Sequence, residues 1–411
     1  MTPRRLAPLA ALAALLVTAL MLRGLLDPRQ SVELPDASLS RPTPMSEIGG
    51  GGGSKLHFPR PSNASMQKSV TGSVSWSGTV KPPGSNYTRM LVVASTKAED
   101  TTWVKKELPG LEAAIYVVDN PQAPLHPPLN KGHELMVFLS FIIDRYDRLP
   151  DIVIFLHAHR FSYHNNEIQG ADAVKMIKAL SSERVTREGY MNLRCTWDPG
   201  CPAHLHPLAK ELDFHHMQPI MAEQWTILFP DAAIPETIAQ PCCSQFAVSR
   251  ERIRSVPLYK FIAWRDWLLR TPVTDYYSGR LWEYLWQYVF TGKSVVCPQP
   301  HICYCDGFGL CFEGEQGYKE VDELLLRRGE VQRQLEEWEQ RAAAVRKAKE
   351  AGAISKELEA PEKGRDTYLL GQRDALNREI DVRTETARQK GKDPAVRAKE
   401  VGRAWQTGDG F

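Results

Sequence analysis

The sequence predicts an α/β protein with a mostly parallel central sheet flanked by helices, followed by a disulfide-rich C-terminal part and a charged helical tail. Three observations lead to this prediction. Short apolar runs with β-branched residues alternate with helix-like stretches in the first half of the chain. All eight cysteines lie between Cys195 and Cys311, and the chain beyond Gly317 is highly charged and favours helix.

The composition excludes several classes of protein. Of the 411 residues, 43% are hydrophobic and 24% are charged, which rules out a wholly disordered chain and a polytopic membrane protein. The 51 Lys and Arg residues nearly balance the 49 Asp and Glu residues, and no long basic run is present. We therefore expect no nucleic-acid partner.

The N-terminus predicts a membrane anchor. Residues 6–22 are uncharged and almost entirely apolar, with Arg4 and Arg5 before them. A cleaved signal peptide is the alternative, but no small residues follow the run, which favours an uncleaved signal anchor. The arginine pair predicts that residues 1–5 are cytoplasmic and the body lumenal, and the short span suits the endoplasmic reticulum or Golgi.

Residues 23–88 are rich in Pro, Ser and Gly and predict a flexible stalk. Asn63 and Asn86 each begin a glycosylation acceptor pattern, which a lumenal location would make usable. A globular lumenal domain is predicted over residues 89–315, and the charged tail over 316–411.

The domain opens with a predicted βαβ unit. A strand, a helix and a second strand are expected in turn over residues 90–95, 102–108 and 114–118. Because parallel strands place their ligand sites at their carboxyl ends, we expect Ser95, Thr96 and Asp119 to bind a ligand there.

The next strand ends in a cluster of polar residues. An amphipathic helix is predicted from about Leu135 to Tyr146, and an apolar strand then covers residues 151–156. This strand runs directly into His157, His159, Arg160 and His164. Chemistry is expected at such a point, where the chain emerges from the core of an α/β sheet.

His157 and His159 alternate with Ala158, so in an extended strand tip they would face the same side and could share a metal or a phosphate. The alternative is that they are ordinary hydrogen-bonded residues at a strand end. His204 and His206 repeat the spacing, and His215 and His216 follow. These four residues come after a pair of cysteines in a predicted loop, so they are weaker candidates for metal ligands.

A lumenal location favours disulfides over zinc for the cysteines. The eight are Cys195, Cys201, Cys242, Cys243, Cys297, Cys303, Cys305 and Cys311. Because adjacent cysteines do not easily pair with each other without strain, we expect Cys242 and Cys243 each to bond to a distant partner.

Glu283 lies in the most aromatic stretch, Ser278 to Trp286. A carboxyl group among aromatic side chains tends to have a raised pKa, as a general acid or base requires. Alternatively, Glu283 pairs with Arg280 three positions away and does nothing more.

The tail has a partial heptad stripe over residues 324–345, interrupted at Arg328. We expect this stripe to pack on the body or to form a short helical contact. Beyond Ala351 the composition predicts weakly stable helix or disorder.

Five motifs occur in order between Arg89 and Cys311. They are residues 130–134 (NKGHE), 146–151 (YDRLPD), 155–160 (FLHAHR) with His164-Asn165, 242–246 (CCSQF), and 278–280 (SGR) with 282–286 (WEYLW). The sequence resembles, in these motifs, a fungal family of proteins of unknown function numbered 3431. More remotely, it resembles polysaccharide-building glycosyltransferases of the nucleotide-sugar (GT-A) fold.

The remote resemblance implies a nucleotide-sugar site with Lys131 and Arg160 near the diphosphate. Such transferases usually carry Asp-x-Asp where this chain has His157-Ala158-His159. Three alternatives remain: these histidines hold a divalent metal such as manganese, the two cations neutralise the diphosphate without a metal, or the chain lacks this chemistry.

Three functions are compatible with these observations. The first is a glycosyltransferase-like enzyme with a glycan acceptor, in which His164 and Glu283 are catalytic and Glu283 is the base. The second is a non-catalytic lumenal scaffold or binding protein. The third is a metal-dependent hydrolase built on the two His-x-His pairs.

Overall fold

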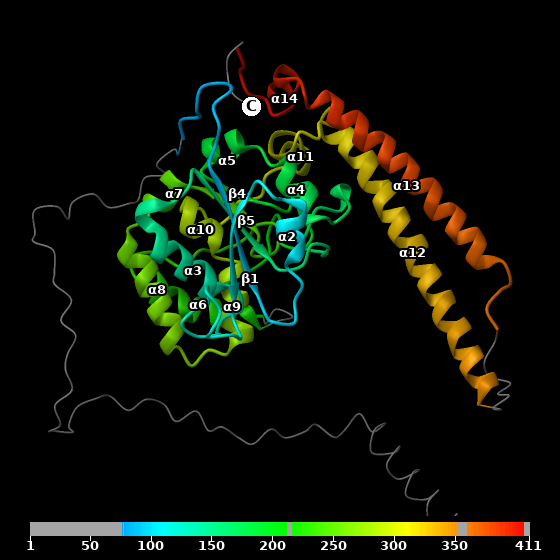
Figure 1. Ribbon diagram of the computed structural model, residues 1–411, viewed down its shortest axis with the longest axis horizontal. Coiled ribbons are helices and arrows are strands. Elements are labelled where there is room, and N and C mark those ends of the chain that lie inside the picture. The colour runs from blue at the N-terminus through cyan, green and yellow to red at the C-terminus, as the bar shows by residue number, and fades with distance from the viewer. Residues whose placement is uncertain (1–75, 77, 212–215, 352–359, 407–411) are drawn as a thin grey trace, which may run out of the picture. The chain divides into compact units, whose positions relative to one another are not determined.

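Five short apolar segments form one sheet in the computed structural model, which describes residues 76, 78–211, 216–351 and 360–406 (Figure 1). The strands are β1 (Arg89–Ser95), β2 (Glu112–Val117), β3 (Ile152–His157), β4 (Tyr190–Asn192) and β5 (Phe246–Ser249). Their order across the sheet is β2-β1-β3-β5-β4. β1 pairs in parallel with both β2 and β3, whereas β5 runs antiparallel to β3 and β4. The prediction of an α/β protein with a central sheet flanked by helices is confirmed.

Alternating side chains of the strands serve two hydrophobic cores, one on each face of the sheet. Val92, Val153 and Phe155 face the first core, while Leu91 and Ile154 face the second. A strand that is buried on both faces reads as a continuous apolar run, which is why the sequence identified β1 and β3.

Helices cover both faces (Figure 1). The first core contains residues from α3 (Leu135–Arg145), α6 (Met217–Leu228), α7 (Arg250–Arg254), α8 (Leu258–Arg270), α9 (Asp275–Glu283) and α10 (Trp286–Thr291). The second contains residues from α2 (Thr102–Glu107), α4 (Ala173–Ala179), α5 (Ser182–Glu188), α11 (Pro300–Phe308), α12 (Glu315–Glu350) and α13 (Arg365–Lys390). Two short 3₁₀ turns, η1 (Tyr146–Arg148) and η2 (Glu167–Gln169), and the helix α14 (Pro394–Glu400) complete the described elements.

The helix α3 is more deeply buried than its expected amphipathic character implies. Every side chain from Leu135 to Ile142 is buried. One side of α3 packs on the sheet, and α8 packs along it as well, so α3 lies in an inner layer. The helix lies where the sequence predicted one, and the outer cover provided by α8 accounts for its deep burial.

The aromatic stretch of the sequence is largely part of the first core. Trp282 and Trp286 are fully buried, with ring centroids 5.1 Å apart. Trp286 also packs on Phe246 of β5 at 4.9 Å between centroids. Glu283 lies between these two tryptophans in the chain, so its environment is set by core packing.

All eight cysteines form disulfides, which confirms that prediction. The pairs are Cys195–Cys303, Cys201–Cys297, Cys242–Cys243 and Cys305–Cys311. The expectation that Cys242 and Cys243 would each find a distant partner was wrong. Cys243 adopts a left-handed backbone conformation, with φ of 84°, and in this conformation the two adjacent sulfurs are bonded to each other.

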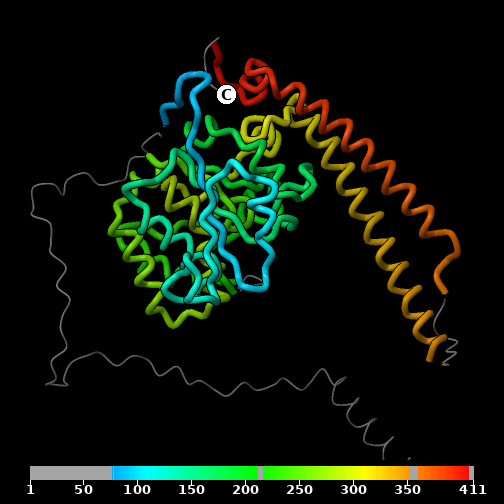
Figure 2. The backbone as a smooth tube through the Cα atoms, in the orientation of Figure 1, coloured from blue at the N-terminus to red at the C-terminus, as the bar shows by residue number. Residues whose placement is uncertain are grey.

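The tail forms two long helices, α12 and α13, that pack along each other (Figure 2). Tyr318 and Val321 of α12 and Ile380 of α13 belong to the second core, so the base of this pair is part of the folded body. The backbone NH of Cys311 also donates to the carbonyl of Ala387, at 3.1 Å. The sequence predicted weak helix or disorder beyond Ala351, whereas the structure has a 26-residue helix there because apolar side chains of α13 pack against α12 and the core.

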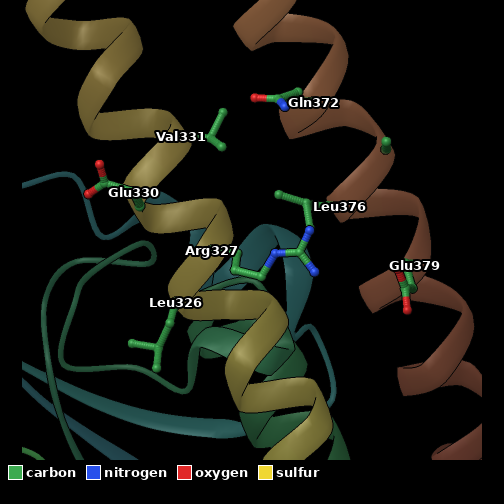
Figure 3. A pocket seen from close by; sticks show the side chains of 8 residues that line it. Leu326, Arg327, Glu330, Val331, Gln372, Leu376 and Glu379 are labelled. Carbon is green, nitrogen blue, oxygen red and sulfur yellow. The ribbon is translucent and has the colours of Figure 1, made fainter.

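Farther from the base, a groove of about 600 Å³ lies between the two helices. Val331 of α12 and Leu376 of α13 point into the gap (Figure 3). Arg327, Glu330 and Glu379 also line it, so the groove is only partly apolar.

The described part of the chain contains no helix with the length and hydrophobicity of a membrane span. The predicted anchor at residues 6–22, most of the stalk and Asn63 lie outside the described residues. Asn86 is exposed just before β1, and its glycosylation stays a prediction.

Candidate functional site

The carboxyl ends of β1, β2 and β3 meet at one edge of the sheet. The chain leaves β1 through α2 to β2 on one side, whereas it leaves β3 through η2, α4 and α5 to β4 on the other side. The connections from the neighbouring strands β1 and β3 therefore diverge at this edge, which is where open α/β sheets form ligand-binding crevices.

The three residues predicted to bind a nucleotide all lie at this edge, and each has a partner within the protein. The buried Ser95 hydroxyl donates to the Tyr116 carbonyl at 3.0 Å. Asp119 is exposed and accepts a hydrogen bond from the backbone NH of Lys97 at 2.8 Å, which joins the tips of β1 and β2. The backbone NH and hydroxyl of Thr96 donate to Glu99 at 2.6 and 3.0 Å.

Glu99 also joins the tips of β1 and β3. Its carboxylate lies 3.5 Å from His159 Nε2, and the His159 side chain is 64% exposed. The sequence did not single out Glu99, which lies four residues after the end of β1. The structure therefore places His159 with a carboxylate partner at the solvent-facing rim.

His157 faces His164. The two imidazole centroids of His157 and His164 are 4.6 Å apart. Within the described residues, the buried Nε2 of His157 and the buried Nδ1 of His164 have no hydrogen-bond partner. Burial, together with the charges of His157, Arg194 and His159, lowers the pKa of His164 to about 4. His164 is therefore neutral at physiological pH.

A set of amide side chains holds this histidine pair in place. Gln245, next to β5, accepts from the His157 backbone NH at 3.4 Å and donates to Asn165 Oδ1 at 2.9 Å. Asn165 in turn donates to the Arg160 carbonyl at 2.9 Å. These contacts join three of the sequence motifs, around residues 157–160, 164–165 and 242–246, into one rigid unit.

The two cations expected at a diphosphate are engaged within the protein. The Arg160 guanidinium donates to both oxygens of Asp172, at 3.1 Å each, and to Glu107 at 3.1 Å. Lys131 Nζ donates to the Thr271 carbonyl at 2.6 Å. The charge of Arg160 is thus balanced by two carboxylates, a tertiary arrangement that the local sequence does not reveal.

The predicted metal ligands do not form a three-ligand site. Among the residues that the structure describes, one group alone brings three such ligand atoms within 4.8 Å of one another, namely Cys305, Cys311 and Glu400. Cys305 and Cys311 are joined in a disulfide, so their sulfurs are not thiolate ligands. No group of three protein ligands therefore includes the predicted histidines among the described residues, and a manganese ion held by His157 and His159 stays a prediction.

His204 and His206, the second His-x-His pair of the hydrolase hypothesis, contact two different partners. His204 Nε2 lies 3.3 Å from the Tyr284 hydroxyl, whereas His206 Nδ1 lies 3.3 Å from the Glu236 carbonyl. His216 precedes α6 with a left-handed backbone, and His215 lies outside the described residues.

The NKGHE motif before α3 and the SGR motif in α9 are far apart in the sequence and meet on the side of the first core. A helix joining parallel strands runs antiparallel to them, so the N-terminus of α3 lies at the same edge as the strand tips. A Cβ added to Gly279 in α9 would lie 2.3 Å from the His133 ring, so the absence of a side chain allows this contact. The Gly132 backbone NH also donates a hydrogen bond to Asp275 Oδ1 at 3.3 Å.

This contact brings Glu134 and Glu283 within electrostatic reach of each other. Burial and the charge of Glu134 together raise the pKa of Glu283 to about 8, against the opposing effect of Arg280. The Arg280 guanidinium lies over the Tyr276 ring, 4.6 Å from its centroid. Glu134 was not chosen as a site residue from the sequence, although its place in the NKGHE motif was a usable signal.

Residues 91–306 match the family described as protein of unknown function (DUF3431). The chain belongs to this family. The DUF3431 region extends from β1 to α11 and includes every residue of the candidate site described above. No curated protein and no solved structure matches the chain. Because the DUF3431 description carries no reaction, a function has to be argued from the site. The expected fungal source stays a prediction.

Proposed function

We propose that this DUF3431 protein is a membrane-anchored lumenal glycosyltransferase-like enzyme that moves a sugar from a nucleotide sugar to a glycan hydroxyl. The observation that carries the proposal is the carboxyl pair of Glu134 and Glu283, brought by α3 and α9 to the edge of the sheet where α/β folds bind ligands. The disulfides support a lumenal body, because disulfides persist in oxidising compartments.

The pKa of Glu283 suits proton transfer near neutral pH. A general base works best when its pKa lies near the working pH, and the pKa of Glu283 is about 8. In the proposed step the acceptor oxygen forms a bond to the anomeric carbon, and the bond from that carbon to the diphosphate breaks. The electron pair of the broken bond leaves with the nucleoside diphosphate, and the hydroxyl proton passes to the Glu283 carboxylate.

His157 and His164 are proposed to orient the donor. Their buried nitrogens are available for hydrogen bonds, and a neutral imidazole donates an NH without carrying charge. Fixed donors of this kind stabilise charge that develops on a leaving group. The amide contacts of Gln245 and Asn165 hold the surrounding backbone in place before a ligand arrives.

A non-catalytic binding protein is the second candidate, and one observation favours it. Arg160 and Lys131, the two cations assigned to the diphosphate, are both engaged in contacts within the protein. A binding protein needs neither a free cation nor a working base. The two candidates therefore differ in whether a nucleotide sugar binds and whether Glu283 matters.

The test uses the full-length chain with its disulfides intact. It is mixed with a panel of uridine, guanosine and cytidine nucleotide sugars and neutral glycan acceptors, with and without manganese, and products are measured by mass spectrometry. Wild type and Glu339→Gln, which changes an exposed carboxyl group on α12, should transfer sugar. Glu283→Gln should lose roughly 100-fold or more in rate, the usual range for a general base.

Two results would defeat the proposal. One is undiminished transfer by Glu283→Gln, which would remove Glu283 from the chemistry. The other is a wild-type melting temperature that no nucleotide sugar raises, because a ligand that binds only the native state must raise it. The second result, with a glycan still bound, would establish the binding protein instead.

A further inference from the structure

Two large aromatic side chains are exposed on the loop that follows β3. Phe161 is 63% exposed and Tyr163 is 75% exposed, the highest value for a large apolar residue in the described part of the chain. A single exposed aromatic side chain needs no explanation. Here two exposed aromatic side chains are separated by one residue and lie directly beside the candidate site, which calls for a functional explanation.

The backbone that carries these rings is held on both sides. Phe161 forms an isolated antiparallel bridge with Asp172. Asn165 Nδ2 donates to the carbonyls of Arg160 and Ala171, at 2.9 Å each. The Arg194 guanidinium also donates to the Tyr163 carbonyl. A fixed loop reduces the ordering entropy that binding would otherwise cost.

The rings border the histidine pair and are themselves partly covered. The Tyr163 ring meets His164 edge-on, with centroids 4.0 Å apart. The Arg160 guanidinium lies 4.9 Å from the Phe161 centroid and covers one face of that ring. Phe161 therefore suits a ligand that stacks from one side only.

We propose that Phe161 and Tyr163 form a stacking platform for a sugar ring of the acceptor glycan. This inference rests on the proposed function and names where that enzyme holds its acceptor. The face of a pyranose that carries its C–H bonds is apolar and stacks on an aromatic ring, while its hydroxyls point outward. The Ser162 hydroxyl and the exposed His159 ring lie in the same loop and provide polar groups at the rim.

The charges around the platform favour a neutral sugar over a nucleotide. Arg160 is balanced by Asp172 and Glu107, and Glu99 lies beside His159. Around the platform the structure therefore places three carboxylates, those of Asp172, Glu107 and Glu99, and two guanidinium groups, those of Arg160 and Arg194. The carboxylates outnumber the guanidinium groups by one, so the two rings suit an uncharged sugar better than a phosphate group.

Binding of neutral oligosaccharides to the full-length chain tests the platform without any donor. The probes are β-1,4-linked glucose, xylose and N-acetylglucosamine oligomers and α-linked mannose oligomers, each measured by calorimetry. Phe161→Ala and Tyr163→Ala should each raise the Kd of the bound oligomer about tenfold, equal to about 1.4 kcal/mol. Tyr259→Ala, which removes a 66% exposed ring from α8, is the matched control and should bind as wild type does.

The outcomes separate this inference from the proposed function. If no oligomer binds to wild type, or if both alanine variants bind the oligomer as wild type does, the platform is refuted. If the variants weaken binding of uridine diphosphate and leave the oligomer unaffected, the rings stack on a nucleobase and the inference is wrong. If Phe161 and Tyr163 govern sugar binding but no transfer occurs with any donor, the platform stands and the enzyme proposal fails.

Discussion

Replacing Glu283 with Gln should make the protein more stable at neutral and alkaline pH. The pKa of this carboxyl group is raised by burial and by the charge of Glu134, from its ordinary value of 4.5 to about 8. The folded state therefore keeps a proton that the unfolded state releases between these values. When the native state binds more protons, stability falls as pH rises, so Glu283 destabilises the fold increasingly above pH 4.5. A neutral amide of the same shape has no such cost.

The size of the effect follows from the same pKa values. The difference of 3.5 units between 4.5 and about 8 corresponds to about 5 kcal/mol, as an upper limit reached above pH 8. At pH 7 the corresponding limit is about 3 kcal/mol, and near pH 4.5 the effect nearly vanishes. We expect a measured gain of at least about 1 kcal/mol at pH 8.

Urea unfolding of the full-length chain at pH 5, 7 and 8.5 measures this gain. The stability difference between Glu283→Gln and wild type should grow with pH, while Glu339→Gln on the exposed face of α12 should follow wild type throughout. A difference that does not depend on pH, or a variant less stable than wild type at pH 8.5, would refute the assignment of a raised pKa. This assay requires no substrate, so it tests the site whatever the protein does.

Three further predictions follow from the charges and covalent links. Glu134→Gln removes a charge that raises the native-state pKa of Glu283, so the loss of stability with rising pH should still begin near pH 4.5 but should level off at a lower pH and be smaller; an unchanged pH dependence would show that the two groups do not interact. Replacing Cys195 and Cys303 together with Ala opens a disulfide with a sequence separation of 108, and should cost about 4–5 kcal/mol in the chain-entropy account, more than loss of the pair separated by 6; equal losses in urea unfolding would contradict it. Burial opposes ionisation of Asp306, but two arginines at 2.5 and 2.6 Å hold its pKa below the ordinary value, so Asp306→Asn should cost about 3–5 kcal/mol at pH 7 and less as pH falls through the native pKa; a pH-independent loss would argue against the ion pairs.

The sequence by itself indicated the strands β1, β2 and β3 and the oxidised state of the cysteines. β1 and β3 are continuous apolar runs because both of their faces are buried, and such a run is visible in a single stretch of residues. The position of His157 at a strand end follows from the same local pattern. The confinement of the cysteines to one region behind a predicted anchor was likewise enough to favour disulfides.

The tertiary structure alone decided which side chains meet. Arg160 is a local candidate for binding phosphate, yet Asp172 and Glu107, supplied by the chain 12 and 53 residues away, balance its charge. Glu134 and Glu283 belong to motifs separated by more than a hundred residues, and they approach because α9 packs a glycine against the loop before α3. The raised pKa of Glu283 depends on this approach and on burial among the helices of the first core. Both are long-range packing effects, which local sequence patterns do not encode.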